Sequence, residues 1–128
     1  MKNVCTVTAD GEVLNPEGNA LQCTLANGQY VGGSFRCAHQ AVTNDGFIEV
    51  CLLRSISRIR FLKILVTYSK GEHLDDPKMK DIVVYRRAKF IHVKAPKGFA
   101  YSLDGEIIYD NGFTAEVVPG ALDLAVPE

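Results

Sequence analysis

Short runs rich in apolar and β-branched residues, separated by turn residues, make up most of this chain. The run at 48–53 is the most apolar, and the run at 4–9 is rich in β-branched residues, as is typical of strands. The other predicted strands are 12–14, 21–26, 35–38, 82–85, 89–93, 99–103, 106–109, 113–118 and 122–126. Gly, Pro, Asn and Asp separate these runs, and Asp10-Gly11 and Asp104-Gly105 are typical of two-residue hairpins.

One segment has helical spacing instead. Apolar residues recur at intervals of three and four between residues 56 and 68, which predicts a helix over about 56–69 with its wide apolar stripe on the core. Ser55 or Ser57 can cap its start, and Lys70-Gly71 can end it. The polar side of this helix carries Arg58, Arg60 and Lys63. A basic amphipathic helix can lie on a membrane, but a core-packed helix with a solvated basic face is the commoner outcome.

This order of elements indicates the fold class. With about eleven short strands, one helix and no alternation of strands with helices, the chain is expected to be mainly β. We predict an antiparallel β-sandwich or barrel-like domain with one main helix. A length of 128 residues is enough for one domain with its own hydrophobic core.

Charge is distributed unevenly along the chain. Residues 51–100 contain twelve Lys and Arg against four acids, whereas residues 101–128 contain six acids and no Lys or Arg. Such asymmetry can mark an anionic membrane or phosphate partner, but it also fits a solvated basic face balanced by acidic neighbours. One reading of the chain is therefore a non-catalytic β-sandwich that binds an anionic membrane or a protein through residues 54–97.

Several kinds of site have no signature in the sequence. The cysteines at 5, 23, 37 and 51 form no Cys-x-x-Cys pair, the three histidines have no metal-ligand spacing, and no glycine-rich nucleotide loop is present. No stretch is long and apolar enough to cross a membrane, and the start of the chain does not resemble a signal peptide. Reduced thiols and a cytoplasmic location are the simplest expectation.

A candidate catalytic carboxylate lies directly after a predicted turn. Glu106 follows Asp104-Gly105, and a carboxylate that a hairpin holds rigidly can serve as a general base. A solvent-facing Glu on an ordinary hairpin explains the same pattern. The tripeptide also occurs at Asp10-Gly11-Glu12, so three residues alone do not decide between the two.

Three blocks of sequence, taken in order, resemble a known family. The first comprises residues 27–33, 38–41 and 44–50, the second is the helix with the following Lys-Gly-Glu-His at 70–73, and the third comprises 103–106 with 119–122 and 126–127. Together they are similar to the C-terminal domain of bacterial diacylglycerol kinases and lipid kinases, which are related to sphingosine and ceramide kinases. The match is weakest at the start of the chain. His39 stands where the family commonly has proline, which we expect to change the stiffness of that loop slightly.

The resemblance implies a two-domain kinase that transfers the γ-phosphate of ATP to a lipid hydroxyl. The family's nucleotide motif, Gly-Gly-Asp-Gly-Thr, is absent here, so residues 1–128 are expected to be the single C-terminal domain, inactive without the nucleotide-binding domain. Diacylglycerol is the preferred acceptor, giving phosphatidic acid, with phosphatidylglycerol, a polyprenol or a sphingoid base as alternatives. The expected partners are the lipid, a membrane surface and the nucleotide-binding domain, with no nucleic acid. A homodimer through an exposed sheet edge is also open.

The resemblance also assigns roles to single residues. Glu106 matches the general base that acts on the lipid hydroxyl. The Asp45 turn matches a structural Mg²⁺ site, in which the Asp45 carboxylate and the backbone carbonyls of Val42 and Phe47 are ligands. Asp104 is expected to shape the hairpin. The resulting expectation is a cytoplasmic protein, peripheral at the membrane.

Overall fold

The computed structural model describes residues 2–30, 36, 38, 40–70, 72, 76–123 and 125. Its strands are β1 (Asn3–Val4), β2 (Thr6–Ala9), β3 (Glu12–Val13), β4 (Asn19–Ala20), β5 (Gln22–Ala26), β6 (Ile48–Leu53), β7 (Val83–Ala88), β8 (Phe90–Leu103) and β9 (Glu106–Glu116). The helices are α1 (Arg58–Ser69) and the short 3₁₀ helix η2 (Pro77–Met79). All the strand pairs are antiparallel, which confirms the predicted mainly β fold.

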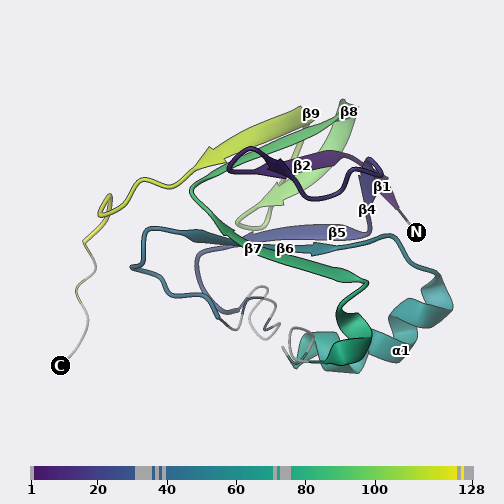
Figure 1. Ribbon diagram of the computed structural model, residues 1–128. Helices are drawn as coiled ribbons and strands as arrows, with labels where there is room; N and C mark the ends of the chain where they lie inside the picture. The colour runs from purple at the N-terminus through teal and green to yellow at the C-terminus, as the bar shows by residue number, and fades with distance from the viewer. Residues whose placement is uncertain are drawn as a thin grey trace.

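The strands form two main sheets that face each other. One sheet has the order β3-β2-β8-β9 and the other β5-β6-β7, while β1 pairs with β4. Helix α1 lies on the side of β5-β6-β7 that is away from the larger sheet, so the domain has three layers (Figure 1). Within the described residues the sheets remain open. The fold is therefore a sandwich, and the barrel-like version of the prediction is wrong.

A hydrophobic core lies on each face of β6. Val50 and Leu52 pack in the cluster between the two sheets, whereas Cys51 and Leu53 pack in the cluster that also contains Ile64 of α1. Successive side chains of a strand point to opposite faces, so a strand covered on both sides is apolar at nearly every position, and Glu49 is the exception in β6. This explains why the run at 48–53 was the clearest strand in the sequence.

The long β8–β9 hairpin differs from the prediction. The sequence indicated four short strands, with turns at 96–98 and 110–112, but the structure has two continuous strands with a register shift between Lys94 and Phe99. Gly98 and Gly112 have φ of 81° and 120° and supply the backbone freedom that this irregularity needs. A Cβ atom at Gly112 would lie 1.9 Å from the carbonyl oxygen of Val93. The turn-forming residues thus make a bulge in one hairpin.

Helix α1 begins where one of the predicted caps stands. The amide of Arg60 donates to Oγ of Ser57 at 3.3 Å, which satisfies a free N–H of the first turn. The prediction that the whole apolar stripe packs on the core is wrong for three residues. The exposed fractions are 71% for Ile59, 65% for Leu62 and 61% for Val66. The physical reason is that apolar residues occupy two faces of α1, and only one face can contact the sheet.

Other predicted elements fall partly outside the described residues. This holds for half of the predicted strand at 35–38 and for part of 122–126, and the described residues of both form no strand. The sequence did not indicate β4, which is held by a buried side chain in the predicted turn at Asn15. Its Oδ1 accepts from the amide of Val7 at 2.8 Å, and its Nδ2 donates to the carbonyl oxygens of Cys5 and Asn19. No helix within the described residues is long and apolar enough to cross a membrane.

Candidate functional site

Glu106 is the first residue of β9, immediately after the tight turn of the long hairpin. Asp104 and Gly105 have φ of 48° and 94°, as a type I′ turn requires, and Glu106 pairs directly with Leu103 across the strands. The carboxylate is exposed and has no hydrogen bond or ion pair with any described residue. The hairpin therefore fixes the backbone of Glu106, and no described residue occupies either carboxylate oxygen.

The surroundings of Glu106 on the hairpin are apolar. Its cross-strand partner Leu103 is 60% exposed, and its neighbour Ile107, on the opposite face, is 65% exposed. On the face that carries Glu106, Tyr101 contacts the ring of Phe113, with ring centroids 4.5 Å apart. Large exposed apolar side chains around one free carboxylate are suited to contact with another apolar surface.

The second predicted site, the Asp45 turn, is built around an ion pair. Oδ1 of Asp45 accepts from the amide of Phe47 at 3.0 Å, and Oδ2 pairs with Nη2 of Arg87 on β7. Arg87 also donates from Nε to Oε1 of Glu49 at 3.0 Å, so one guanidinium bridges two carboxylates. Burial lowers the pKa of Arg87, but the two carboxylates raise it by more, so Arg87 stays charged.

An aromatic ring and the C-terminal segment complete this turn. The Phe47 ring lies under two cations, with the guanidinium carbon of Arg87 5.5 Å and Nζ of Lys89 5.1 Å from the ring centroid. A Cβ built on Gly46 would meet the Pro119 side chain at 3.8 Å, so the segment that follows β9 passes next to the turn. The structure thus places Gly46 and Pro119, which belong to the first and third blocks of the family resemblance, next to each other.

A buried polar pair lies behind the Arg87 bridge. The side chain of Glu49 is 1% exposed. The pKa of Tyr85 is raised, mainly because Tyr85 is desolvated by burial and to a smaller extent because the Glu49 carboxylate lies nearby. Neither Oε2 of Glu49 nor the Tyr85 hydroxyl makes a hydrogen bond of normal geometry within the described residues. The roles of Glu49 and Arg87 were not predicted from the sequence. The available signal was that Glu49 alternates with Cys51 and Leu53, and a carboxylate on an apolar face requires a partner.

The residues at the Asp45 turn fit magnesium in chemical type, because a carboxylate and two backbone carbonyls are oxygen ligands. However, both Asp45 oxygens already accept hydrogen bonds from the protein. In the part of the chain that the structure describes, no three His, Cys, Asp or Glu side chains come close enough to hold a metal ion. Magnesium would therefore compete with Arg87 for the Asp45 carboxylate.

The two predicted sites are not brought together within this chain. Glu106 begins β9, whereas the Asp45 turn lies beside Pro119, beyond the end of the same strand. Val42, which precedes Asp45 by three residues in the same loop, is 47% exposed. His39 lies outside the described residues.

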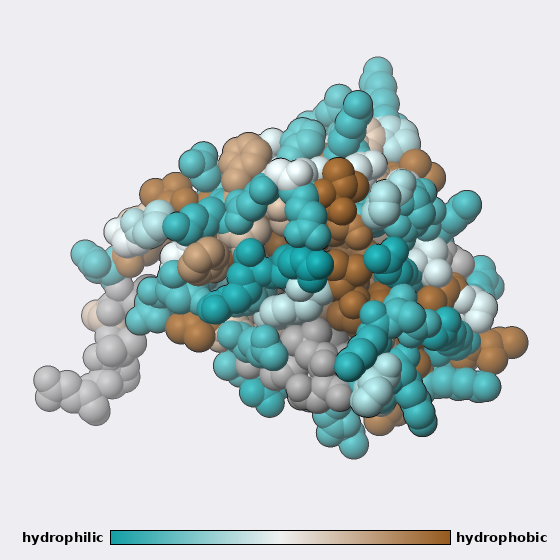
Figure 2. Space-filling model, in the orientation of Figure 1, coloured by the Kyte–Doolittle hydropathy of each residue, from teal (hydrophilic) through white to brown (hydrophobic). Residues whose placement is uncertain are grey.

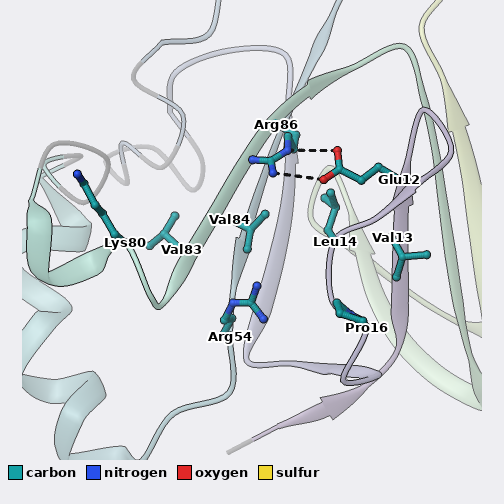
Figure 3. Close-up of a pocket in the computed structure, with 9 residues that line it drawn as sticks. All are labelled: Glu12, Val13, Leu14, Pro16, Arg54, Lys80, Val83, Val84 and Arg86. Carbon is teal, nitrogen blue, oxygen red and sulfur yellow. Dashed lines mark hydrogen bonds and ion pairs between the residues drawn. The ribbon is translucent and has the colours of Figure 1, made fainter.

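A pocket of about 410 Å³ lies elsewhere, at the edge where β3 approaches β7 (Figure 3). It contains Glu12, the counterpart of Glu106 in the repeated tripeptide, which accepts from Arg86 at 3.3 Å. Arg54, another lining residue, pairs with Glu17 at 2.8 Å. Arg54 and Arg86 are thus already paired, whereas Lys80, which also lines the pocket, has no ion pair with a described residue. None of the predicted site residues lines the pocket.

Comparison with known proteins identifies the family. The family model for the YegS C-terminal NAD kinase beta sandwich-like domain matches residues 2–126. The chain belongs to this family. It is 33% identical over 104 residues to a "Probable lipid kinase YegS-like" of Chromohalobacter salexigens, which covers 81% of this chain and 32% of that protein. It is 28% identical over 117 residues to the lipid kinase YegS of Escherichia coli K12, covering 91% of this chain and 36% of that protein.

A solved structure supports the same fold. A Bacillus anthracis protein described as a "putative diacylglycerol kinase" superposes with a TM-score of 0.66 at 20% identity, covering 94% of this chain and 38% of that one. The predicted resemblance to the lipid kinase family is therefore confirmed. The chain spans about a third of the length of the YegS proteins that it matches.

Proposed function

We propose that this YegS-type domain is the acceptor-lipid half of an ATP-dependent lipid kinase. The family match over residues 2–126 and the lipid kinases among its relatives support this assignment. The observation that carries it is the Glu106 carboxylate, which a rigid hairpin holds exposed and without a countercharge among the described residues.

In the proposed reaction, Glu106 accepts the proton of the lipid hydroxyl. As that proton leaves, the hydroxyl oxygen forms a bond to the γ-phosphorus of ATP, and the bond between this phosphorus and the bridging oxygen of ADP breaks. The nucleotide site belongs to the nucleotide-binding domain that the family resemblance implies. This chain contributes the base and an apolar surface around it.

Diacylglycerol is the proposed acceptor, with phosphatidic acid as the product. The test is phosphate transfer from labelled ATP by the two-domain protein, in which this chain follows its nucleotide-binding domain. Diacylglycerol, phosphatidylglycerol, a polyprenol and a sphingoid base are presented separately in mixed micelles. Labelled phosphatidic acid is the expected product. If another lipid were labelled instead, that lipid would be the substrate. If no lipid were labelled, the kinase proposal would be wrong.

Magnesium is proposed to bind at Asp45, with the carbonyls of Val42 and Phe47, and there it would supply positive charge that fixes the turn. Since Arg87 occupies the same carboxylate, we expect Arg87→Gln to increase the stabilisation by Mg²⁺, measured as the rise in Tm between metal-free and millimolar Mg²⁺ buffers. Arg86→Gln is the matched control, because Arg86 is the adjacent residue but pairs with Glu12. A response to Mg²⁺ that survives Asp45→Asn would place the metal elsewhere.

The alternative is a non-catalytic sandwich that binds an anionic membrane or a protein through residues 54–97. The observation in its favour is the cationic character of this segment, which includes all of α1. It predicts binding without phosphate transfer in the two-domain protein. In either case we propose that the protein acts in the cytoplasm, peripheral at the membrane.

A further inference from the structure

Helix α1 has an apolar face that no described part of this chain covers. Ile64 packs inward on the cluster that contains Leu53, whereas Ile59, Leu62 and Val66 are exposed by 71%, 65% and 61%. Their spacing of three and four residues places them in one stripe on the outer side of the helix. A surface helix in water normally has polar residues there, so this stripe is suited to an apolar environment.

Cations border the stripe, and acids are absent from the helix. Lys63 follows Leu62 directly, Lys70 lies one turn beyond Val66, and Arg58 precedes Ile59. None of these three cations has an ion pair with a described residue, whereas Arg60, on the inner side, is held by Asp81 at 2.6 Å. The outer side of α1 therefore combines apolar side chains with uncompensated positive charge.

The position of α1 leaves this side accessible. The helix forms the outer layer of the domain, beyond β5-β6-β7 (Figure 1). In the space-filling view, apolar side chains lie among hydrophilic ones over this part of the molecule, at the lower right (Figure 2). The surface is thus presented on the outside of the molecule, away from the β8–β9 sheet.

We propose that α1 is the membrane-contact element of this domain and that its occupant is an anionic lipid bilayer. Ile59, Leu62 and Val66 enter the boundary between headgroups and acyl chains, while the bordering lysines and arginine contact headgroup phosphates. A second copy of this chain fits poorly, because pairing the same face would bring like charges together. The choice of a lipid partner rests on the proposed lipid kinase function.

The test is co-sedimentation of the full chain with vesicles of phosphatidylcholine, with or without phosphatidylglycerol. We expect binding to the anionic vesicles only, and Leu62→Gln to weaken it by about tenfold, because an apolar group that enters the bilayer is lost. Val4→Gln is the matched control: Val4 is also an exposed aliphatic residue, at 56%, but lies on β1. Equal losses from the two substitutions, or equal binding to neutral vesicles, would overturn the proposal.

The charged border has its own test. Lys63→Gln with Lys70→Gln should weaken binding to anionic vesicles and flatten its salt dependence, because exposed charges are screened by salt. Lys97→Gln, an exposed lysine on β8, should change neither. Loss of a dimer in Leu62→Gln without any vesicle binding by the wild type would show that α1 binds a second copy, which overturns the membrane assignment.

Failure of this inference can be distinguished from failure of the kinase proposal. In the two-domain protein, Leu62→Gln should lose turnover on vesicle-borne lipid but keep it on a short-chain, monomeric acceptor. Glu106→Gln should bind vesicles normally and lose turnover on both acceptors. Normal vesicle turnover in Leu62→Gln would contradict the role of α1 alone, and normal turnover in Glu106→Gln would contradict the catalytic role alone.

Discussion

Two hairpins of this domain are built on the same tripeptide, Asp10-Gly11-Glu12 between β2 and β3 and Asp104-Gly105-Glu106 between β8 and β9. Their turns are nearly identical, with φ of 46° and 84° in the first and 48° and 94° in the second. In both, two residues connect the paired positions, Ala9 with Glu12 and Leu103 with Glu106. The local sequence therefore produces the same type I′ turn twice.

The surroundings of the first turn use both of its acids. The Asp10 carboxylate accepts from the amides of Lys89 and Phe90, at 3.2 Å and 2.9 Å, and so ties the β2–β3 turn to the start of β8. Glu12 pairs with Arg86 of β7. These carboxylates have structural partners in neighbouring strands.

The second turn has no such partners among the described residues, and its two carboxylates are exposed. A carboxylate without a structural partner is free to accept a proton, whereas one that is already paired must first be released. The same tripeptide thus forms a structural turn in one place and a candidate catalytic turn in the other, and the difference lies in the tertiary environment.

The largest expected effect concerns activity. Glu106→Gln in the two-domain protein should lower the rate of lipid phosphorylation by about 10²- to 10⁴-fold, because the amide cannot accept the hydroxyl proton. Glu12→Gln should leave the rate within about twofold, since Glu12 makes only a surface ion pair. The measurement is kcat with labelled ATP. Equal loss in both variants would show that the two hairpins do not differ in function.

The next effect concerns stability. Asp10→Ala removes an acceptor for two backbone amides and should lower the free energy of unfolding by about 1–2 kcal/mol more than Asp104→Ala. Both substitutions place Ala at a positive φ, so this shared strain cancels in the difference. Urea denaturation of the two variants measures it. Identical midpoints would mean that the contacts between Asp10 and β8 contribute nothing.

The glycines should behave alike. Both have positive φ, and a Cβ on either would meet nothing within 4 Å, so Gly11→Ala and Gly105→Ala should each destabilise by about 1 kcal/mol. The prediction is equality, again from urea midpoints. A clear difference between the two variants would show that the turns are not locally equivalent.

The smallest expected effect is the change in the free energy of unfolding when Glu12 or Glu106 is replaced. Glu12→Gln should lower stability by about 0–1 kcal/mol, and raising the salt concentration should reduce that difference, as for other exposed ion pairs. Glu106→Gln should not destabilise the domain. A marked destabilisation by Glu106→Gln would reveal a structural partner and weaken its assignment as the base.

Much of the fold could be predicted from the local sequence pattern, namely wherever a single factor, such as burial of both faces of a strand, determines that pattern. Strand β6 was predicted with its correct bounds because both of its faces are buried, and α1 was predicted because its inner face has helical spacing. The continuous β8–β9 hairpin could not be predicted, because Gly98 and Gly112 are equally suited to a turn and to a bulge. Pairing between the strands, which local sequence does not report, decided between them.

The candidate site was predictable only in part. Glu106 was a candidate from its place after a tight turn, whereas Asp45 was found through the family resemblance, which also assigned both roles. Those proposed roles await the experiments above. Arg87 was missed because it lies 42 residues from Asp45 in the chain and meets it only when β7 pairs with β6. The exposed stripe of α1 was missed because helical periodicity shows that residues share a face without showing what the face contacts.

The sequence by itself determined the mainly β class, the position of the helix and two identical Asp-Gly turns, because these depend on the conformational preferences of neighbouring residues. The tertiary structure alone decided that Asp10 and Glu12 have partners, while Asp104 and Glu106 have none in the part of the chain that the structure describes. It also decided that Arg87 bridges Asp45 and Glu49, and that three apolar residues of α1 face outward. The physical reason is the same in each case: burial and charge pairing depend on which distant segments meet, and that is settled only when the strands pair and the layers pack.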